Sequence, residues 1–175
     1  MNEALRDIAV VKEFVFKAHE NAKNHGFHDK KLDLEEAVML IVSEIGEAIE
    51  ADRRHKNAVE NPLDCMDDSF VFCIKDTYED EIADIFIRLF DTAGYYGIIP
   101  KYILLNYTSD THAGRLLYLT MTVLSIAVQP TVTSFNYVYS NLVDFCDKFE
   151  IDIIPFIEAK MKYNEGREYR HGKAY

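Results

Sequence analysis

The sequence predicts an all-α protein, a bundle of about five or six helices. Apolar residues recur at helical spacing over several long segments, and no segment of convincing length alternates apolar and polar residues as a strand would. Of the 175 residues, 49% are hydrophobic and 28% are charged, a balance typical of a folded chain with a substantial core. We therefore expect residues 1–175 to form a single helical domain.

Caps and breakers set the expected helix boundaries. Asp33 is a candidate N-cap of the second helix, Gly26 and Gly97 follow the first and third helices, and Thr133 or Ser134 can cap the fifth. The expected helices cover about 2–24, 34–55, 77–96, 110–128, 134–149 and 154–164, with a further short helix at 100–106 and a helical turn or brief strand at 70–74.

The charge balance limits the classes of partner. Nineteen Lys and Arg residues against thirty Asp and Glu residues give a net charge of −11, which argues against a broad electrostatic grip on nucleic acid or on an anionic membrane. The longest apolar run, Leu116 to Val128, is shorter than the roughly 20 residues that cross a bilayer. We expect neither nucleic acid nor membrane as a partner, and an anionic ligand would require a metal ion as mediator.

The cysteines indicate a reducing compartment. Cys65, Cys73 and Cys146 are odd in number and lack the spacing of a zinc knuckle, so neither a disulfide framework nor a structural zinc site is indicated. Residues 1–7 lack the basic and apolar stretches of a secretory signal. These features predict a cytoplasmic protein.

Two pairs of carboxylates carry the strongest chemical signal. Glu44 and Glu47 lie three residues apart in the second expected helix, and Glu81 and Asp84 have the same spacing in the third. Residues at i and i+3 share a helix face, so two packed helices can bring all four acids together. Carboxylate oxygens are the ligands that Mg²⁺ prefers, with Mn²⁺ as a possible substitute. Taken singly, each acid is more easily explained as a solvated residue beside an apolar stripe.

Three segments in order along the chain resemble the MazG-like all-α nucleoside triphosphate pyrophosphohydrolases. The segment S-E-I-G-E-A-I-E at residues 43–50 and the segment E-D-E-I-A-D-I-F-I-R at 79–88 look like the family's ExxE…ExxD signature. The stretch K-M-K-Y-N-E-G-R-E-Y-R-H-G-K at 160–173 is similar to its K…N…R…HGK segment. The resemblance implies a four-helix core, and hydrolysis of a nucleoside triphosphate to the monophosphate and pyrophosphate.

The resemblance also implies roles for particular residues. The Mg²⁺ ligands would be Glu44, Glu47, Glu81 and Asp84, and the phosphate contacts would come from Lys160, Asn164, Arg167 and Lys173. Ser43 stands where the family often has a further Glu, which leaves the number of metal ions and the identity of the general base open. Glu47 is the candidate base that we favour, because a carboxylate not fully engaged by metal can take a proton from water.

The base of a nucleotide would need an apolar pocket with aromatic walls. Phe14, Phe27, Phe86 and Tyr163 are candidates, although aromatic residues at helical spacing mostly belong to a core. The histidines do not form Glu-x-x-His pairs on two helices, so a ferritin-like di-iron centre is disfavoured. Asp91 is more easily explained as part of a solvated face than as an extension of the acidic site.

The leading hypothesis is thus a Mg²⁺-dependent pyrophosphohydrolase acting on noncanonical or surplus (d)NTPs. One alternative is a non-catalytic helical oligomerisation module, whose acids form salt bridges between subunits. Another is a related phosphohydrolase acting on a different nucleotide, such as phosphoribosyl-ATP. Sites built on two or three helices often need a neighbouring subunit to close them, so we expect a homo-oligomer, a dimer or a tetramer.

Overall fold

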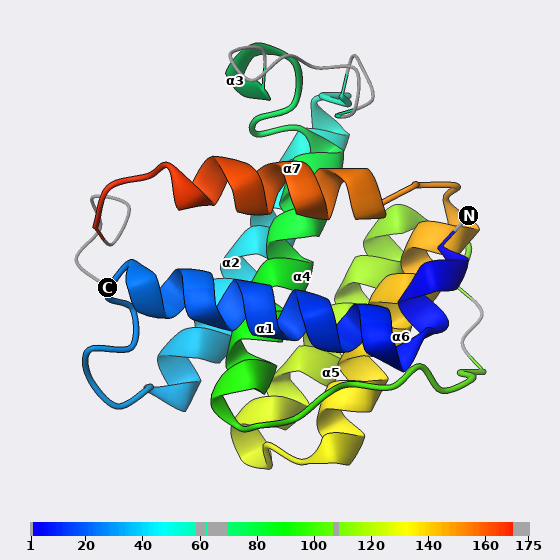
Figure 1. Ribbon diagram of the computed structural model, residues 1–175. Helices are drawn as coiled ribbons and strands as arrows, with labels where there is room; N and C mark the ends of the chain where they lie inside the picture. Colours follow the sequence, from blue (N-terminus) through cyan, green and yellow to red (C-terminus); the bar gives the residue numbers. More distant parts are fainter. Residues whose placement is uncertain (1, 59–61, 63–69, 107–108, 170–175) are drawn as a thin grey trace.

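The computed structural model describes residues 2–58, 62, 70–106 and 109–169, and this part of the chain is an all-α bundle (Figure 1), as predicted. Six helices have twelve residues or more, and two have only four. The helices are η1 (Glu3–Arg6), α1 (Ile8–Asn24), α2 (Leu34–Arg53), α3 (Phe70–Cys73), α4 (Tyr78–Tyr95), α5 (His112–Val128), α6 (Val132–Lys148) and α7 (Ile154–Glu165).

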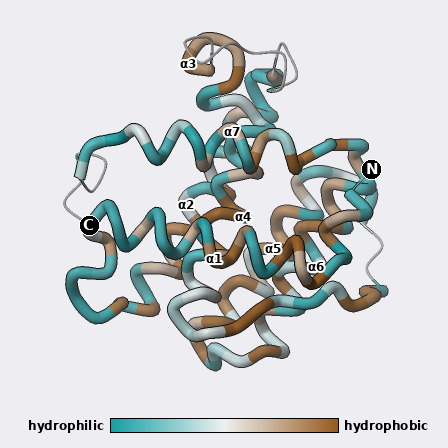
Figure 2. The backbone as a smooth tube through the Cα atoms, in the orientation of Figure 1, coloured by the Kyte–Doolittle hydropathy of each residue, from teal (hydrophilic) through white to brown (hydrophobic). Residues whose placement is uncertain are grey.

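Helix α4 lies at the centre of the bundle. It contacts α1, α2, α6 and α7, and α2 runs antiparallel beside it (Figure 1). Helices α5 and α6 form an antiparallel hairpin, and α1 and α7 lie side by side across α4. Residues from every helix join one cluster of buried apolar side chains. Figure 2 shows apolar and polar stretches alternating along α1, as expected of a helix that buries one face.

Side-chain caps mark the starts of α1, α2, α4, α5 and α6. Asp33 accepts hydrogen bonds from the backbone N–H groups of Glu35 and Glu36 at 3.0 and 3.1 Å, which confirms it as the N-cap of α2. Thr77 caps α4 in the same way. The expected cap of the fifth helix was wrong: Thr131 is the N-cap of α6, and Ser134 is its partner in a capping box. No helix in the described part combines the length and apolar character that a membrane crossing requires.

Two further boundaries differ from the prediction. The first expected helix is split at Asp7, whose extended backbone and side chain cap α1 through a 2.8 Å hydrogen bond from the Ala9 N–H.

The short helix predicted at 100–106 is absent from that described stretch. There the Lys101 N–H donates to Asn136 Oδ1 of α6 and the Ile103 N–H donates to Ser140 Oγ, both at 2.8 Å. These tertiary hydrogen bonds give two of the backbone donors partners outside a helix. The 70–74 stretch takes the helical alternative as α3.

Gly94 permits the close approach of α1 to α4. A Cβ atom at this position would lie 2.7 Å from the Cβ of His19 and 2.9 Å from its Cγ. Gly94→Ala is therefore expected to lower the free energy of unfolding by about 1–3 kcal/mol, because the helices must separate. Gly46→Ala is the matched control, since a Cβ atom there meets nothing within 4 Å of the described structure; it should stabilise α2 by about 0.5–1 kcal/mol. Urea unfolding of both variants checks the pair, and equal effects would contradict this packing.

Candidate functional site

A cavity of about 570 Å³ lies between α1, α2, α4, α7 and the connection from α1 to α2. Seven of the eight predicted site residues line it: Glu44, Glu47, Glu81, Asp84, Lys160, Asn164 and Arg167. The eighth, Lys173, lies outside the described residues. Three helices that are distant in sequence thus bring their acids and cations to one space.

Three of the four predicted acids form a group that we call the carboxylate cluster: Glu44, Glu81 and Asp84. Each offers an oxygen atom, and these atoms lie within 4.8 Å of one another. Glu44 and Glu81 are only 6% and 4% exposed. Their burial follows from the antiparallel packing of α2 against α4, where each acid borders an apolar stripe. Because Glu44 and Glu81 are buried, they are not solvated surface acids.

Glu47 is placed differently. It is exposed, it lines the cavity, and its Oε1 accepts a 3.4 Å hydrogen bond from the hydroxyl of Ser43. It does not belong to the carboxylate cluster. The structure therefore leaves Glu47 beside the cluster, in contact with the open cavity.

The buried ammonium of Lys160 pairs with two acids of α4. Its Nζ lies 2.6 Å from Asp80 Oδ2 and 2.8 Å from Asp84 Oδ2. Asp80 is fully buried; its Oδ2 also accepts from the N–H of Asp76 at 2.9 Å, while its Oδ1 is a buried atom with no partner in the described structure. Sequence reasoning did not select Asp80. Its i, i+4 spacing from Asp84 was the available signal.

Arg88 is a second cation that the sequence prediction did not assign. Its Nε donates to Glu44 Oε1 at 2.6 Å across the α2–α4 contact. It closes the E-D-E-I-A-D-I-F-I-R segment, one turn after Asp84. Arg88 and Lys160 thus each pair with one acid of the carboxylate cluster.

The acids at this end of the cavity outnumber the cations that pair with them. Burial, and then the nearby charge of Asp84, raise the pKa of Glu81 to about 8. Burial also raises the pKa of Glu44, against the opposing charge of Arg88, and raises that of Asp80 to about 6 despite Lys160. Burial alone would lower the pKa of Lys160, but Asp84 and Asp80 raise it above its ordinary value. Such a site favours the uptake of a proton or a further cation.

The predicted aromatic residues divide into two sets. Phe14 and Phe86 are buried in the core, whereas Phe27 and Tyr163 line the cavity. The Tyr163 ring stacks on Phe70 with centroids 4.7 Å apart, and the guanidinium of Arg167 lies 5.9 Å from the Tyr163 ring centre. Only Phe27 and Tyr163 are placed where a nucleobase could reach them.

Fold and site together define an all-α helix bundle with a carboxylate-rich cavity whose acids could hold a metal ion. Comparison of the chain with models of protein families, with curated proteins and with solved structures finds no match. The functional argument therefore depends on the residues of the cavity.

Proposed function

We propose that the protein is a Mg²⁺-dependent nucleoside triphosphate pyrophosphohydrolase, which releases pyrophosphate and a nucleoside monophosphate from (d)NTPs. One observation carries the proposal: the carboxylate cluster of α2 and α4 shares a cavity with Lys160 and Asn164 of α7 and with Arg167, which follows this helix. The resemblance of the three sequence segments to MazG-like enzymes points to the same residues.

The carboxylate cluster suits Mg²⁺ on chemical grounds. It supplies only oxygen ligands, and its buried acids have raised pKa values in the absence of a cation. Mn²⁺ has the same preference for oxygen. When bound, the cation would neutralise charge on the phosphates and on the leaving pyrophosphate.

The chain itself supplies the remaining functions. Lys30, Lys31 and Arg167 line the cavity and can bind phosphate oxygens, with Arg167 in fork geometry. Glu47 is the acid free to hold a water molecule and accept its proton. The water oxygen then bonds to one phosphorus atom of the α–β anhydride and the bridging P–O bond breaks, so that the nucleoside monophosphate and pyrophosphate separate. Phe27 and Tyr163 can contact the base.

The reaction class is tested with a panel of canonical and modified (d)NTPs, with and without Mg²⁺, and products resolved by ³¹P NMR. The proposal predicts pyrophosphate and monophosphate only when Mg²⁺ is present. Release of orthophosphate would assign a different reaction. No turnover by well-folded protein would favour the non-catalytic module, and turnover of phosphoribosyl-ATP alone would favour the related phosphohydrolase.

Mg²⁺ stabilisation should depend on pH through Glu81. The pKa of Glu81 is raised from 4.5 to about 8, so its contribution to stability is complete below about 4.5 and is lost as pH rises through about 8. Mg²⁺ replaces the lost proton, so it should raise Tm more at about pH 8.5 than at about pH 6. Differential scanning fluorimetry measures this, with Glu81→Gln as the control that loses the difference. Equal Tm shifts at both pH values in the wild type would contradict it.

For assembly, we propose a homodimer built on an exposed apolar stripe of α5. The stripe consists of Leu117, Met121, Leu124 and Val128, which follow one another at helical spacing and are all exposed. Residues 112–143 contain no acidic residue, although the chain as a whole has a net charge of −11. A second copy can therefore dock on this face without the repulsion expected elsewhere on the surface.

Met121→Glu should convert the dimer into a monomer, because it buries a charge at the centre of the stripe. Light scattering coupled to gel filtration gives the mass. Phe16→Glu is the matched control, since Phe16 is also an exposed apolar residue but belongs to α1; it should leave the dimer intact. A monomeric wild type, or a dimeric Met121→Glu variant, would refute the docking face.

A further inference from the structure

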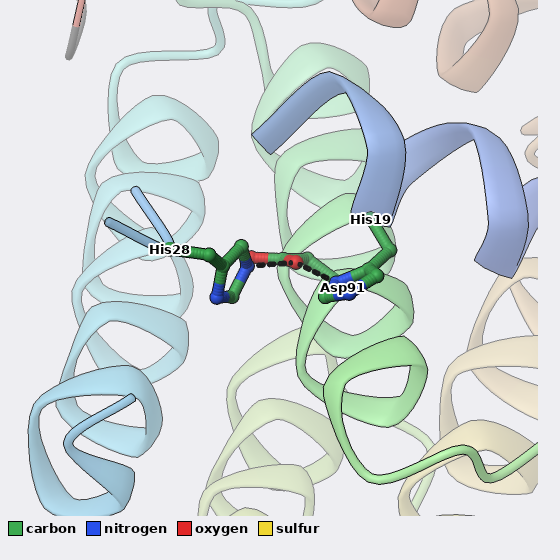
Figure 3. A group of neighbouring side chains, drawn as sticks. All are labelled: His19, His28 and Asp91. Atoms are coloured by element: carbon green, nitrogen blue, oxygen red, sulfur yellow. Dashed lines mark hydrogen bonds and ion pairs between the residues drawn. The ribbon is translucent and has the colours of Figure 1, made fainter. Parts of the chain in front are cut away.

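A second group of potential metal ligands lies at another part of the same cavity. His19 of α1, His28 of the α1–α2 connection and Asp91 of α4 converge, as Figure 3 shows, and we call them the histidine cluster. His19 Nδ1 lies 2.9 Å from Asp91 Oδ1, and His28 Nε2 lies 2.6 Å from the same oxygen (Figure 3). Asp91 is therefore not the solvated acid expected from the sequence.

The surrounding structure holds both imidazoles in place. The two rings are 4.7 Å apart, and Tyr95 stacks on His28 at 5.6 Å. Gly94 leaves the space that His19 needs against α4. The His28 side chain is 7% exposed, and its Nδ1 is buried without a partner among the described residues. The ring nitrogen that faces Asp91 is Nε2, so Nε2 is the candidate metal ligand of His28.

We propose that His19, His28 and Asp91 bind a transition-metal ion of the zinc type, at a site distinct from the carboxylate cluster. Two imidazole nitrogens and one carboxylate oxygen are a ligand set typical of Zn²⁺ with an open position, whereas Mg²⁺ prefers oxygen alone. Metal–ligand bonds of about 2.0–2.1 Å place tetrahedral ligands roughly 3.3–3.4 Å apart. The N···O distances of 2.6 and 2.9 Å must therefore widen by about 0.4–0.8 Å.

The site is open to a further ligand from the cavity. His28 and Asp91 line the cavity that also contains the carboxylate cluster, so a water molecule or a ligand group can reach the fourth position. The two cation sites share no residue. The zinc-type site consequently does not depend on the proposed hydrolase activity, and either proposal can fail without the other.

The test is a titration of the tag-free full chain with Co²⁺, a visible spectroscopic substitute for Zn²⁺, in a large excess of Mg²⁺. The wild type is expected to bind one Co²⁺ with d–d absorption bands, and Zn²⁺ should displace it. The excess Mg²⁺ occupies the carboxylate cluster. Because Mg²⁺ competes poorly for imidazole nitrogen, it should not abolish the Co²⁺ bands of the histidine cluster. Absence of saturable bands in the wild type would overturn the proposal.

His19→Asn and His28→Gln separate metal binding from a structural role. The Asn amide replaces Nδ1 of His19 and the Gln amide replaces Nε2 of His28, so each keeps an N–H donor for Asp91 but is a poor zinc ligand. Each variant should therefore weaken Co²⁺ binding by at least about a hundredfold. His112→Gln is the matched control, because His112 pairs with Asp52 at 3.0 Å and belongs to no group of potential metal ligands among the described residues. Glu44→Gln controls for the carboxylate cluster. Both controls should bind Co²⁺ as the wild type does. Zn²⁺ should raise Tm in the wild type and the controls only, and unchanged Co²⁺ affinity in both histidine-cluster variants would refute the site.

Discussion

Glu44→Gln and Asp84→Asn should each lower (d)NTP turnover by at least about a hundredfold, which corresponds to about 2.7 kcal/mol of lost transition-state stabilisation. Both substitutions keep the side-chain shape and remove one negative charge from the carboxylate cluster. A cation held by the two remaining acids would be bound more weakly and positioned less well. Steady-state pyrophosphate release at saturating Mg²⁺ measures the effect.

The control for this experiment is Glu50→Gln. Glu50 belongs to the same helix, but it pairs with Arg53 and Arg54 on the surface and does not line the cavity. Its turnover should match the wild type, and circular dichroism should show native helix content in all three variants. Near-normal turnover in both Glu44→Gln and Asp84→Asn would contradict the proposal that the carboxylate cluster binds the catalytic metal ion.

Lys160→Met is expected to cost about 3–5 kcal/mol of the free energy of unfolding. The ammonium of Lys160 is the nearest countercharge of the fully buried Asp80 and also pairs with Asp84. Methionine fills much of the same volume, so the loss comes from the uncompensated buried charge rather than from a cavity. Urea unfolding measures it as a lower midpoint with an unchanged m-value.

Two further variants isolate the charge effect. Lys162→Met removes an exposed ammonium from the same helix and should change the free energy of unfolding by no more than about 0.5 kcal/mol. Adding Asp80→Asn to Lys160→Met should recover much of the loss, because the unpaired charge is removed as well. A Lys160→Met variant with nearly wild-type stability would show that the ion pair does not hold α7 against α4.

Local sequence signals predicted those helix boundaries that depend on a capping residue or on a glycine. Asp33 and Thr77 cap α2 and α4, and Gly97, with φ of 65°, follows the end of α4. The local signals failed where contacts between residues distant in sequence determine the backbone conformation. Apolar periodicity runs through Asp7 without showing the break, and the helix predicted at 100–106 was wrong because side chains of α6 bind that backbone.

The candidate site shows the same division. The i, i+3 spacing predicted that Glu44, Glu47, Glu81 and Asp84 would come together; the structure groups three of them and leaves Glu47 beside the cluster. The spacing could not predict the ion pairs of Lys160 and Arg88, because those pairs depend on how α7 and α2 pack against α4. The histidine cluster joins residues that are up to 72 positions apart, so no local motif reveals it.

The most direct test is a crystal structure of the protein with Mn²⁺ and a non-hydrolysable (d)NTP analogue, analysed by anomalous scattering. The proposed function predicts a Mn²⁺ peak among Glu44, Glu81 and Asp84, with the triphosphate reaching from this ion toward Lys30, Lys31 and Arg167. A nucleotide bound elsewhere, or a carboxylate cluster without Mn²⁺ at saturating concentration, would contradict it.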